Sequence, residues 1–260
     1  MALVVKALEG AIASLVLNRP EARNALSIEM CDAIVDALGE IDVMDAVRVV
    51  LVRGEGSVFC SGADFAAVSG PSGIEFVAAF ERMLDAIARH RLPIIASIHG
   101  AALGGGLQLA TACDFRITAG DARLGIPSAR LGILVNFENV RRLTLLVGLA
   151  RAKEILMTAR VYSGAEAVAT GLVNRSVPAR DLAAETESWA REIAALSPLS
   201  VQGSKRALQV LFDDMSNPRN RAPGPSSEMD ELVAQAYASD DLQEGVRAMQ
   251  ERRPPDFTGR

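Results

Sequence analysis

The sequence predicts an α/β fold with a helical C-terminal extension, on three observations. Strand-like and helix-like segments alternate through the first half of the chain. From about Phe137 onward the pattern is almost entirely helical. Half of the 260 residues are apolar and 23% are charged, which is the balance of a globular protein that can bury a large core. One large domain with an appended segment is therefore expected.

The first two apolar runs predict a β-hairpin. They cover Ala2–Leu8 and Ala11–Leu17 and are separated by the short turn Glu9-Gly10. The segment Asn18-Arg19-Pro20 ends the second strand, because proline lacks the amide hydrogen that a central strand needs. Ser27 then has the residue type of a helix N-cap. Apolar positions follow it at roughly helical spacing: Ile28, Ile34, Leu38 and Ile41.

Three short segments rich in apolar residues predict further strands, which are Val47–Val52, Pro93–Ile98 and Phe115–Thr118. A loop at Ser69–Gly73 precedes a helix that runs to about Arg89, and Gly104-Gly105-Gly106 opens a short helix that ends near Cys113. Helical periodicity fills the second half at Val140–Val147, Arg151–Ala159, Ala165–Thr170, Asp181–Leu196 and Leu199–Phe212. The polar segment Asp213–Ser227 predicts a flexible loop, and helical periodicity resumes at Glu228 and at Asp240–Glu251.

Charge and cysteine content indicate where the protein works and what it binds. The chain carries 27 basic and 32 acidic side chains, and this acidic balance argues against nucleic acid or an anionic membrane as the main partner. Three widely spaced cysteines form no disulfide framework, which favours a reducing, cytoplasmic compartment. The long uncharged run between Arg91 and Asp114 contains a proline, four glycines and several polar residues, so we do not interpret it as a membrane span.

Several common catalytic motifs are missing from the sequence. It contains no G-x-S-x-G, H-E-x-x-H, Walker A or G-x-G-x-x-G pattern. The only histidines are His90 and His99, which argues against a histidine-based triad or a multi-histidine metal site. We interpret His99, at a predicted strand end, as a structural residue.

Two glycine-bearing turns offer a different chemistry. They are Phe59–Asp64 and His99–Gln108, and each follows a predicted strand and could begin a helix. The first amides of a helix lack intrahelical partners, so two such turns facing each other would direct a pair of N–H donors at one oxygen. In an oxyanion hole each donor is typically worth about 3 kcal/mol to the developing charge. The other interpretation is that these are only tight turns with closely packed glycines, and composition alone leaves both open.

The order and spacing of several short motifs are more specific than any of them alone. They are Asn18-Arg19-Pro20, Asn24-Ala25-Leu26, Phe59–Asp64, Leu103–Gly106, Ala112-Cys113-Asp114, Gly171–Asn174, Val177-Pro178 and Arg252–Phe257. With these motifs the chain resembles the crotonase (enoyl-CoA hydratase/isomerase) superfamily over nearly its whole length. The resemblance implies a spiral of ββα units, with a core at 1–195 that holds an acyl-CoA site and a helical C-terminal region at 196–260.

That family stabilises the enolate of an acyl-CoA thioester. The resemblance therefore implies an acyl-CoA substrate, with coenzyme A as part of the substrate and no other cofactor or metal. It implies a homotrimer or a dimer of trimers, assembled through the C-terminal helices. The oxyanion donors would be the backbone amides of Ala63 and Gly105. The implied substrate-binding residues are Arg23, Ala25, Ser61, Gly62, Asp64, Gly104 and Asn136, although a structural role for Asp64 as a local cap is preferred.

The departures from the family pattern bear on the reaction. Hydratases of this family carry glutamates at two positions that are Gln108 and Ser128 here. Hydration needs one group to activate water and another to deliver a proton, and glutamine cannot titrate while an unassisted serine is a poor base. An aspartate that is catalytic in some relatives corresponds to Asn136, so the nearest carboxylate is Glu138. Glu138 is either a proton shuttle or an acid that stabilises the start of its helix.

These residues leave several functions open. The first is an isomerase-type or other enolate reaction on an acyl-CoA, because one base can move a proton between two carbons. The second is a catalytically degenerate acyl-CoA-binding protein, and a third is a hydrolase that uses Gln108 and Ser128 to orient water. The direction in which Glu138 points should distinguish the first two.

Overall fold

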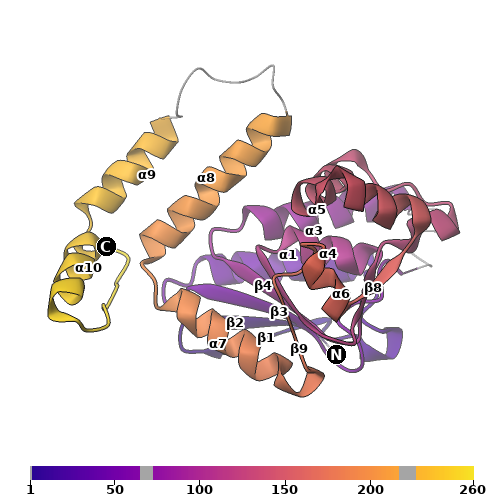
Figure 1. Cartoon of the computed structure of the whole chain (residues 1–260), viewed down its shortest axis with the longest axis horizontal. Coiled ribbons are helices and arrows are strands. Elements are labelled where there is room, and N and C mark those ends of the chain that lie inside the picture. The colour runs from indigo at the N-terminus through magenta and orange to yellow at the C-terminus, as the bar shows by residue number, and fades with distance from the viewer. Residues whose placement is uncertain (1, 65–72, 217–226) are drawn as a thin grey trace.

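Six strands form the central sheet of the computed structural model, which describes residues 2–64, 73–216 and 227–260 (Figure 1). The sheet has the order β1 (Val4–Glu9), β2 (Ile12–Leu17), β3 (Val49–Gly54), β4 (Ile94–Ile98), β6 (Phe115–Ala119) and β9 (Arg175–Val177). The first two strands form the predicted antiparallel hairpin, and every later neighbour pairs in parallel. Because helices cover both faces of a parallel sheet, its inner strands are mostly apolar, and all five residues of β4 are buried, including Ser97.

A smaller sheet carries the second glycine-bearing turn. It consists of β5 (Ala101–Leu103), β7 (Arg123–Gly125) and β8 (Val161–Ser163), with β7 in the middle. An isolated parallel bridge joins Cys60 to Ala102. That bridge brings the segment after β3 alongside β5, so the two glycine-bearing turns become neighbours.

The helices of the core lie on both sides of the central sheet. They are α1 (Ile28–Asp42), α3 (Gly73–Arg89), α4 (Gly105–Ala112), α5 (Phe137–Thr158), α6 (Gly164–Ala169) and α7 (Leu182–Ala194). Figure 1 shows α7 along one side of the sheet and α1 with α3 along the other. As predicted, Ser27 caps α1, because its hydroxyl accepts a hydrogen bond from the amide of Met30. The two helices predicted at Val140–Val147 and Arg151–Ala159 form one element, α5, broken at Gly148 by a non-helical backbone conformation.

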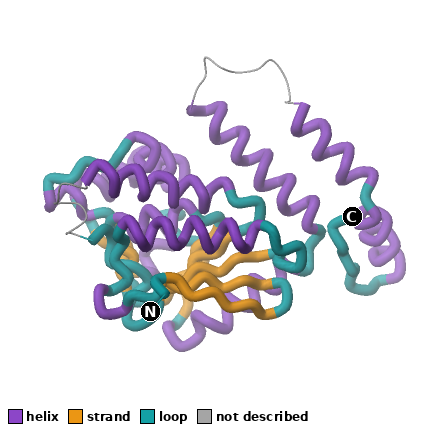
Figure 2. The backbone as a smooth tube through the Cα atoms, turned by 180° about the vertical axis from the view of Figure 1, so that it is seen from behind, coloured by secondary structure: helices purple, strands orange, loops and turns teal. Residues whose placement is uncertain are grey.

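The last three helices stand apart from the sheet. They are α8 (Pro198–Ser216), α9 (Ser227–Ala238) and α10 (Asp240–Glu251), and the first two run side by side (Figures 1 and 2). The bounds predicted for the loop at Asp213–Ser227 were wrong, since α8 continues to Ser216 and α9 includes Ser227. Residues 217–226 lie outside the described residues. Most of the loop predicted at Ser69–Gly73 also lies outside them. Asp213, in the last part of α8, accepts hydrogen bonds from Arg89 of α3 at 2.8 and 3.1 Å, which ties this end of α8 to the core. The predicted division at 195–196 falls between α7 and α8 and stays a prediction.

Arg116 of β6 is a buried cation held by carbonyl groups. Its residue is 3% exposed, and its guanidinium donates hydrogen bonds to four backbone carbonyls, those of Ala110, Cys113, Asp114 and Leu172. Two of these carbonyls, of Ala110 and Cys113, lie at the C-terminal end of α4, where carbonyls have no intrahelical partner. Burial lowers the pKa of Arg116. The side chain therefore ties the end of α4 to the neighbouring chain segments.

We expect Arg116→Met to lower the free energy of unfolding by about 3–5 kcal/mol, because it leaves several buried carbonyls without donors. Urea denaturation monitored by circular dichroism measures the change. Arg82→Met is the matched control, because Arg82 forms an exposed ion pair with Asp32 and its loss should cost only about 0–1 kcal/mol. Equal effects of the two substitutions would contradict the role assigned to Arg116.

Within the ranges that the structure describes, no helix combines the length and apolar character needed to cross a membrane.

Candidate active site

A cavity of about 470 Å³ lies where the two glycine-bearing turns meet α3 and the segment before α5. Its lining includes all the predicted site residues except Glu138: Ala63, Gly105, Gln108 and Ser128 among the catalytic candidates, and Arg23, Ala25, Ser61, Gly62, Asp64, Gly104 and Asn136 among the binding candidates. Apolar side chains form much of the remaining wall, contributed by Phe76, Val77, Phe80, Leu131, Ile133, Leu134 and Val135. The sequence motifs therefore converge on one cavity with an apolar wall.

The first turn directs the amide of Ala63 toward the cavity. Residues on either side of Ala63 pair with Leu26: the Leu26 amide donates to the Gly62 carbonyl and the Asp64 amide donates to the Leu26 carbonyl, both at 2.8 Å. In a parallel bridge the residue between two bonded neighbours turns its own N–H to the opposite side. Gly62 has a φ of 112°, and a Cβ there would lie 2.8 Å from the Leu103 carbonyl oxygen, so glycine is required.

The second turn presents the amide of Gly105. Gly105 is the first residue of α4 and follows the N-cap Gly104, so its N–H has no intrahelical partner. A Cβ on Gly105 would lie 3.4 Å from the Ala63 nitrogen, which brings the two amides close together. Neither amide donates a hydrogen bond to another group in the described part of the chain. One oxygen in the cavity can therefore accept hydrogen bonds from both, as an oxyanion hole requires.

The two uncharged replacements lie beside these donors. Gln108 is on α4, one turn after Gly105, and Ser128 is in the short helix Pro127–Leu131. Both line the cavity, so the positions are present although the carboxylates are not. These two side chains can orient a polar group or a water molecule, but neither can act as a titrating base near neutral pH.

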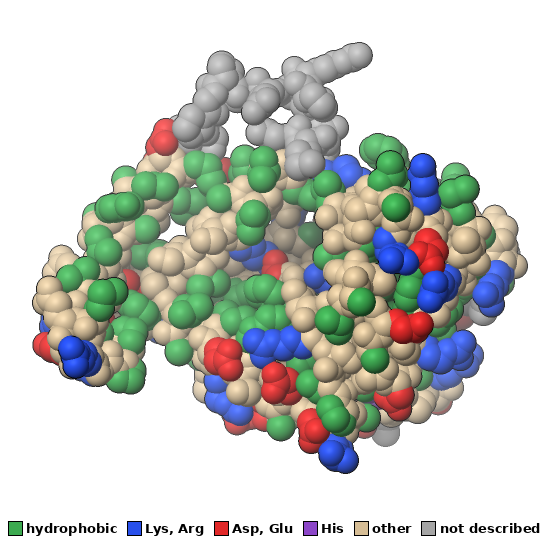
Figure 3. Space-filling view, viewed as in Figure 1, with side chains coloured by type: hydrophobic (Ala, Val, Ile, Leu, Met, Phe, Trp, Pro, Cys, Tyr) green, Lys and Arg blue, Asp and Glu red, His purple; other side chains and the backbone are tan. Residues whose placement is uncertain are grey.

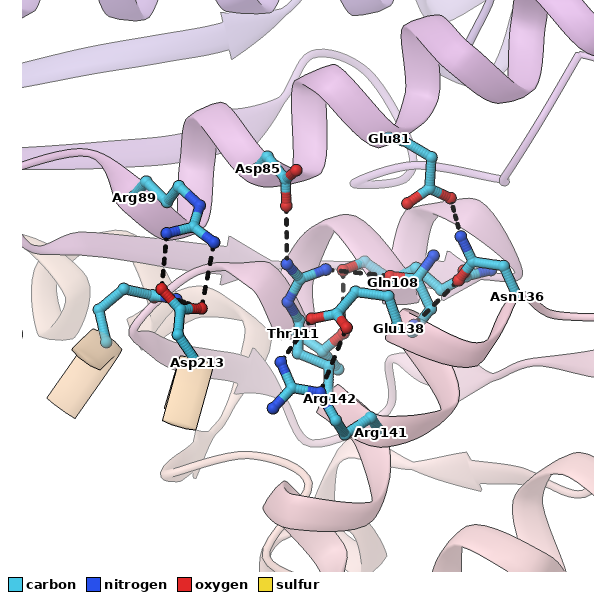
Figure 4. A network of polar contacts seen from close by, with 12 residues as sticks. Glu81, Asp85, Arg89, Gln108, Thr111, Asn136, Glu138, Arg141, Arg142 and Asp213 are labelled. Carbon is cyan, nitrogen blue, oxygen red and sulfur yellow. Dashed lines mark hydrogen bonds and ion pairs between the residues drawn. The ribbon is translucent and has the colours of Figure 1, made fainter. Parts of the chain in front are cut away.

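Glu138 does not lie where a proton shuttle would be needed. It occupies the first turn of α5, and Arg141 donates two hydrogen bonds to its carboxylate, at 2.7 and 3.2 Å (Figure 4). Arg141 also donates to the carbonyl of Phe212 and lies 3.4 Å from the centre of that ring. Glu138 is not among the described residues that line the cavity. The geometry therefore favours the helix-start acid and gives the predicted catalytic role no support.

Asp64 has a structural partner at the edge of the cavity. Its carboxylate pairs with the guanidinium of Arg19 at 2.7 Å, and Arg19 also approaches the carbonyl of Ala25 at 3.5 Å. The ion pair joins the first turn to the Asn18-Arg19-Pro20 segment. The predicted structural role of Asp64 therefore takes the form of an ion pair, although its residue also lines the cavity.

Sequence reasoning missed an acidic residue in the cavity. Glu81 of α3 lines it, and one carboxylate oxygen accepts a hydrogen bond from the Asn136 side-chain amide (Figure 4). Burial raises the pKa of Glu81 above its usual value of 4.5. The available signal was the helical spacing of Phe76, Val77, Phe80 and Glu81, which places all four on adjoining faces of α3. Amphipathic periodicity alone does not show that such a face meets a cavity.

Comparison with known proteins identifies the family. The profile of a family described as "Enoyl-CoA hydratase/isomerase" matches residues 7–260. The chain belongs to the enoyl-CoA hydratase/isomerase family. This membership confirms the predicted superfamily and its α/β fold with a helical C-terminal region.

Similar proteins cover nearly the whole length of this family member. The probable enoyl-CoA hydratase echA6 of Mycobacterium leprae is 36% identical over 253 residues, which are 94% of each chain. The crotonyl-CoA hydratase of Syntrophomonas wolfei is 36% identical over 253 residues, covering 96% of this chain and 95% of that protein. The crystal structure of an enoyl-CoA hydratase/carnithine racemase from Magnetospirillum magneticum superimposes with a TM-score of 0.90 at 29% identity, covering 100% of this chain and 97% of that one.

Proposed function

We propose that this family member binds an acyl-CoA thioester and moves a proton between carbons of the acyl group through an enolate. The observation that carries the proposal is the pair of backbone amides of Ala63 and Gly105. Both residues line the cavity and lie close together, and neither amide has another partner in the described chain. The thioester oxygen would accept both hydrogen bonds and hold the negative charge. The apolar wall suits an acyl chain, and a reaction that uses backbone donors needs no metal or redox cofactor.

Hydration is the less favoured reaction for this cavity. The relatives above are named as hydratases, but here Gln108 and Ser128 occupy the two positions of the predicted water-activating and proton-donating groups. Adding water requires two proton transfers in a defined geometry, whereas an isomerisation needs one base that accepts a proton and returns it.

The second candidate is a protein that binds acyl-CoA without turning it over. The observation that favours it concerns Glu138, the carboxylate nearest to Asn136 in the sequence. It is paired with Arg141 and does not line the cavity. Binding and turnover must therefore be measured on the same thioesters.

We expect a panel of α,β- and β,γ-enoyl-CoA thioesters of different length to show double-bond migration without a gain in mass. Mass spectrometry and chiral chromatography of the products make the measurement. A gain in mass equal to water would contradict the proposed reaction and indicate a hydratase. Tight binding with unchanged thioesters throughout the panel would support the second candidate.

We also propose a homotrimer or a dimer of trimers. Helices α8 to α10 lie away from the central sheet and expose large apolar side chains, including Leu208, Tyr237 and Met249. Figure 3 shows hydrophobic side chains gathered over α8, α9 and the adjoining face of the core. We expect sedimentation at micromolar concentration to give a multiple of three times the 27.5 kDa chain. A stable monomer would contradict this assembly.

A further inference from the structure

We propose that Glu81, on α3, is the residue that carries the proton in this cavity. The inference rests on the proposed function and names the group that performs it. Glu81 lies outside every motif through which the sequence resembles its family, and the position expected to supply the carboxylate, Glu138, is paired elsewhere.

The location of Glu81 is the first argument. Among described residues, the acidic side chains that line the cavity are Asp64 and Glu81, and Asp64 is paired with Arg19. Helix α3 packs directly against the oxyanion turn, since the ring of Phe80, the residue before Glu81, lies 3.3 Å from where a Cβ on Gly105 would be. The carboxylate thus belongs to a helix that contacts the donors for the thioester oxygen.

The orientation of the carboxylate is the second argument. Asn136 donates a hydrogen bond from Nδ2 to Oε1 of Glu81, while its own Oδ1 caps α5 by accepting from the amide of Asn139, at 2.9 Å. Because one amide group makes both bonds, the N-cap of α5 fixes Glu81. The other carboxylate oxygen, Oε2, makes no hydrogen bond to the described residues, so it is available to a substrate. Asn136 is accordingly a positioning residue.

Burial and the neighbouring charges together make the carboxylate of Glu81 a stronger base. Arg142 of α5 lowers the pKa of Glu81, while Asp85 of α3 and Glu138 of α5 raise it. Arg142 is itself committed to Asp85, at 3.2 Å, and to Asn139, at 3.0 Å. Burial is the largest influence and leaves the pKa raised. A carboxylate with a raised pKa is a stronger base than an unperturbed one.

The step conserves every atom. When a β,γ-enoyl thioester is converted to the α,β isomer, the Glu81 carboxylate takes a proton from the α carbon, next to the thioester carbonyl. In the reverse direction it takes the proton from the γ carbon. The electron pair of the broken C–H bond passes into the conjugated enolate, whose oxygen is held by Ala63 and Gly105. The protonated Glu81 then returns the same proton to the other carbon, where a new C–H bond forms and the double bond has moved. No water, oxidant or reductant enters.

The test uses Glu81→Gln in the full-length protein with a β,γ-enoyl-CoA thioester. Glutamine keeps the size and can still bond to Asn136, but it cannot accept a proton. We expect isomerisation to fall by about 10²–10⁴-fold, while the dissociation constant of a saturated acyl-CoA changes little. Glu75→Gln is the matched control, because Glu75 is an exposed residue of the same helix, and it should retain the activity of the unmodified protein.

A second variant separates a chemical role from a structural one. Asn136→Asp keeps the oxygen that caps α5 but replaces the donor to Glu81 with a second carboxylate. Two carboxylates that share a site raise the pKa of one of them. Since the base must be deprotonated, activity falls as the pH drops through its pKa, which gives the pH profile an acidic limb. This limb should lie above pH 4.5 in the unmodified protein. It should move to still higher pH in Asn136→Asp. Because the new aspartate could itself act as a base, Asn136→Asp is also measured together with Glu81→Gln. Activity that survives in this double variant with the same acidic limb would overturn the role of Glu81.

The outcomes distinguish the two proposals. Isomerisation that persists in Glu81→Gln and is lost in Glu138→Gln would overturn the assignment of Glu81 and leave the proposed function intact. An unmodified protein that binds the thioesters but neither isomerises them nor exchanges protons of butyryl-CoA in deuterium oxide would overturn both. Loss in Glu81→Gln together with the shifted limb in Asn136→Asp supports both.

Discussion

Replacing Gly105 with proline is expected to lower turnover of the thioester by about 10²–10³-fold, because it deletes one of the two N–H donors to the developing oxyanion. Proline is tolerated at the first position of a helix, so α4 can still form. Binding of the ground-state thioester should weaken far less, since the donor matters most where negative charge develops. Steady-state kinetics and a separate measurement of the dissociation constant distinguish these effects.

The control for this prediction is Gly105→Ala. Alanine adds a Cβ within 3.3–3.4 Å of Phe80, Leu26 and the Ala63 nitrogen, yet it keeps the N–H group. Any loss in alanine therefore reports crowding, and the further loss in proline reports the missing donor. Thermal denaturation of both variants establishes that they are folded. If proline retains the turnover of alanine, the assignment of Gly105 as an oxyanion donor is wrong.

Restoring both carboxylates, in the double variant Gln108→Glu with Ser128→Glu, is expected to introduce or raise hydratase activity. The donors of the oxyanion hole are backbone groups, so they persist when the side chains change. Gln108 and Ser128 line the same cavity as Ala63 and Gly105, which places the new acids where water would react. General acid–base groups contribute typically about 10²–10⁴-fold.

The size of that gain depends on space in the cavity. Leu134, Val135 and Asn136 line it in the segment before α5, and their side chains can occupy the place of the water. The single variants are the controls, because either carboxylate alone supplies only half of the proton transfers. The product gain in mass from an α,β-enoyl-CoA measures hydration. A double variant that binds this thioester and adds no water would show that the cavity lacks the geometry for hydration.

Local sequence determined much of this protein. Ser27 starts α1 because its hydroxyl satisfies a helix amide, and Gly104 starts α4 because it adopts a backbone conformation that other residues avoid. The inner strands could be predicted because a strand covered on both faces is mostly apolar, as β4 is at four of its five residues. The two glycine-bearing turns could be recognised because Gly62 and Gly104 have a positive φ that glycine tolerates. The contact that excludes a Cβ at Gly62 comes from Leu103, which is distant in sequence.

Only the tertiary structure decided which carboxylate meets the cavity. Glu138 and Asn136 are two residues apart, yet the start of α5 turns Asn136 into the cavity and leaves Glu138 to Arg141. Glu81 reaches the same place from α3, which is more than fifty residues earlier in the chain. Likewise, the Ala63 amide faces the cavity because its neighbours pair with Leu26. Helical periodicity shows which residues lie on the same face of a helix, but not which segment packs against that face. The packing partner depends on contacts between segments distant in sequence.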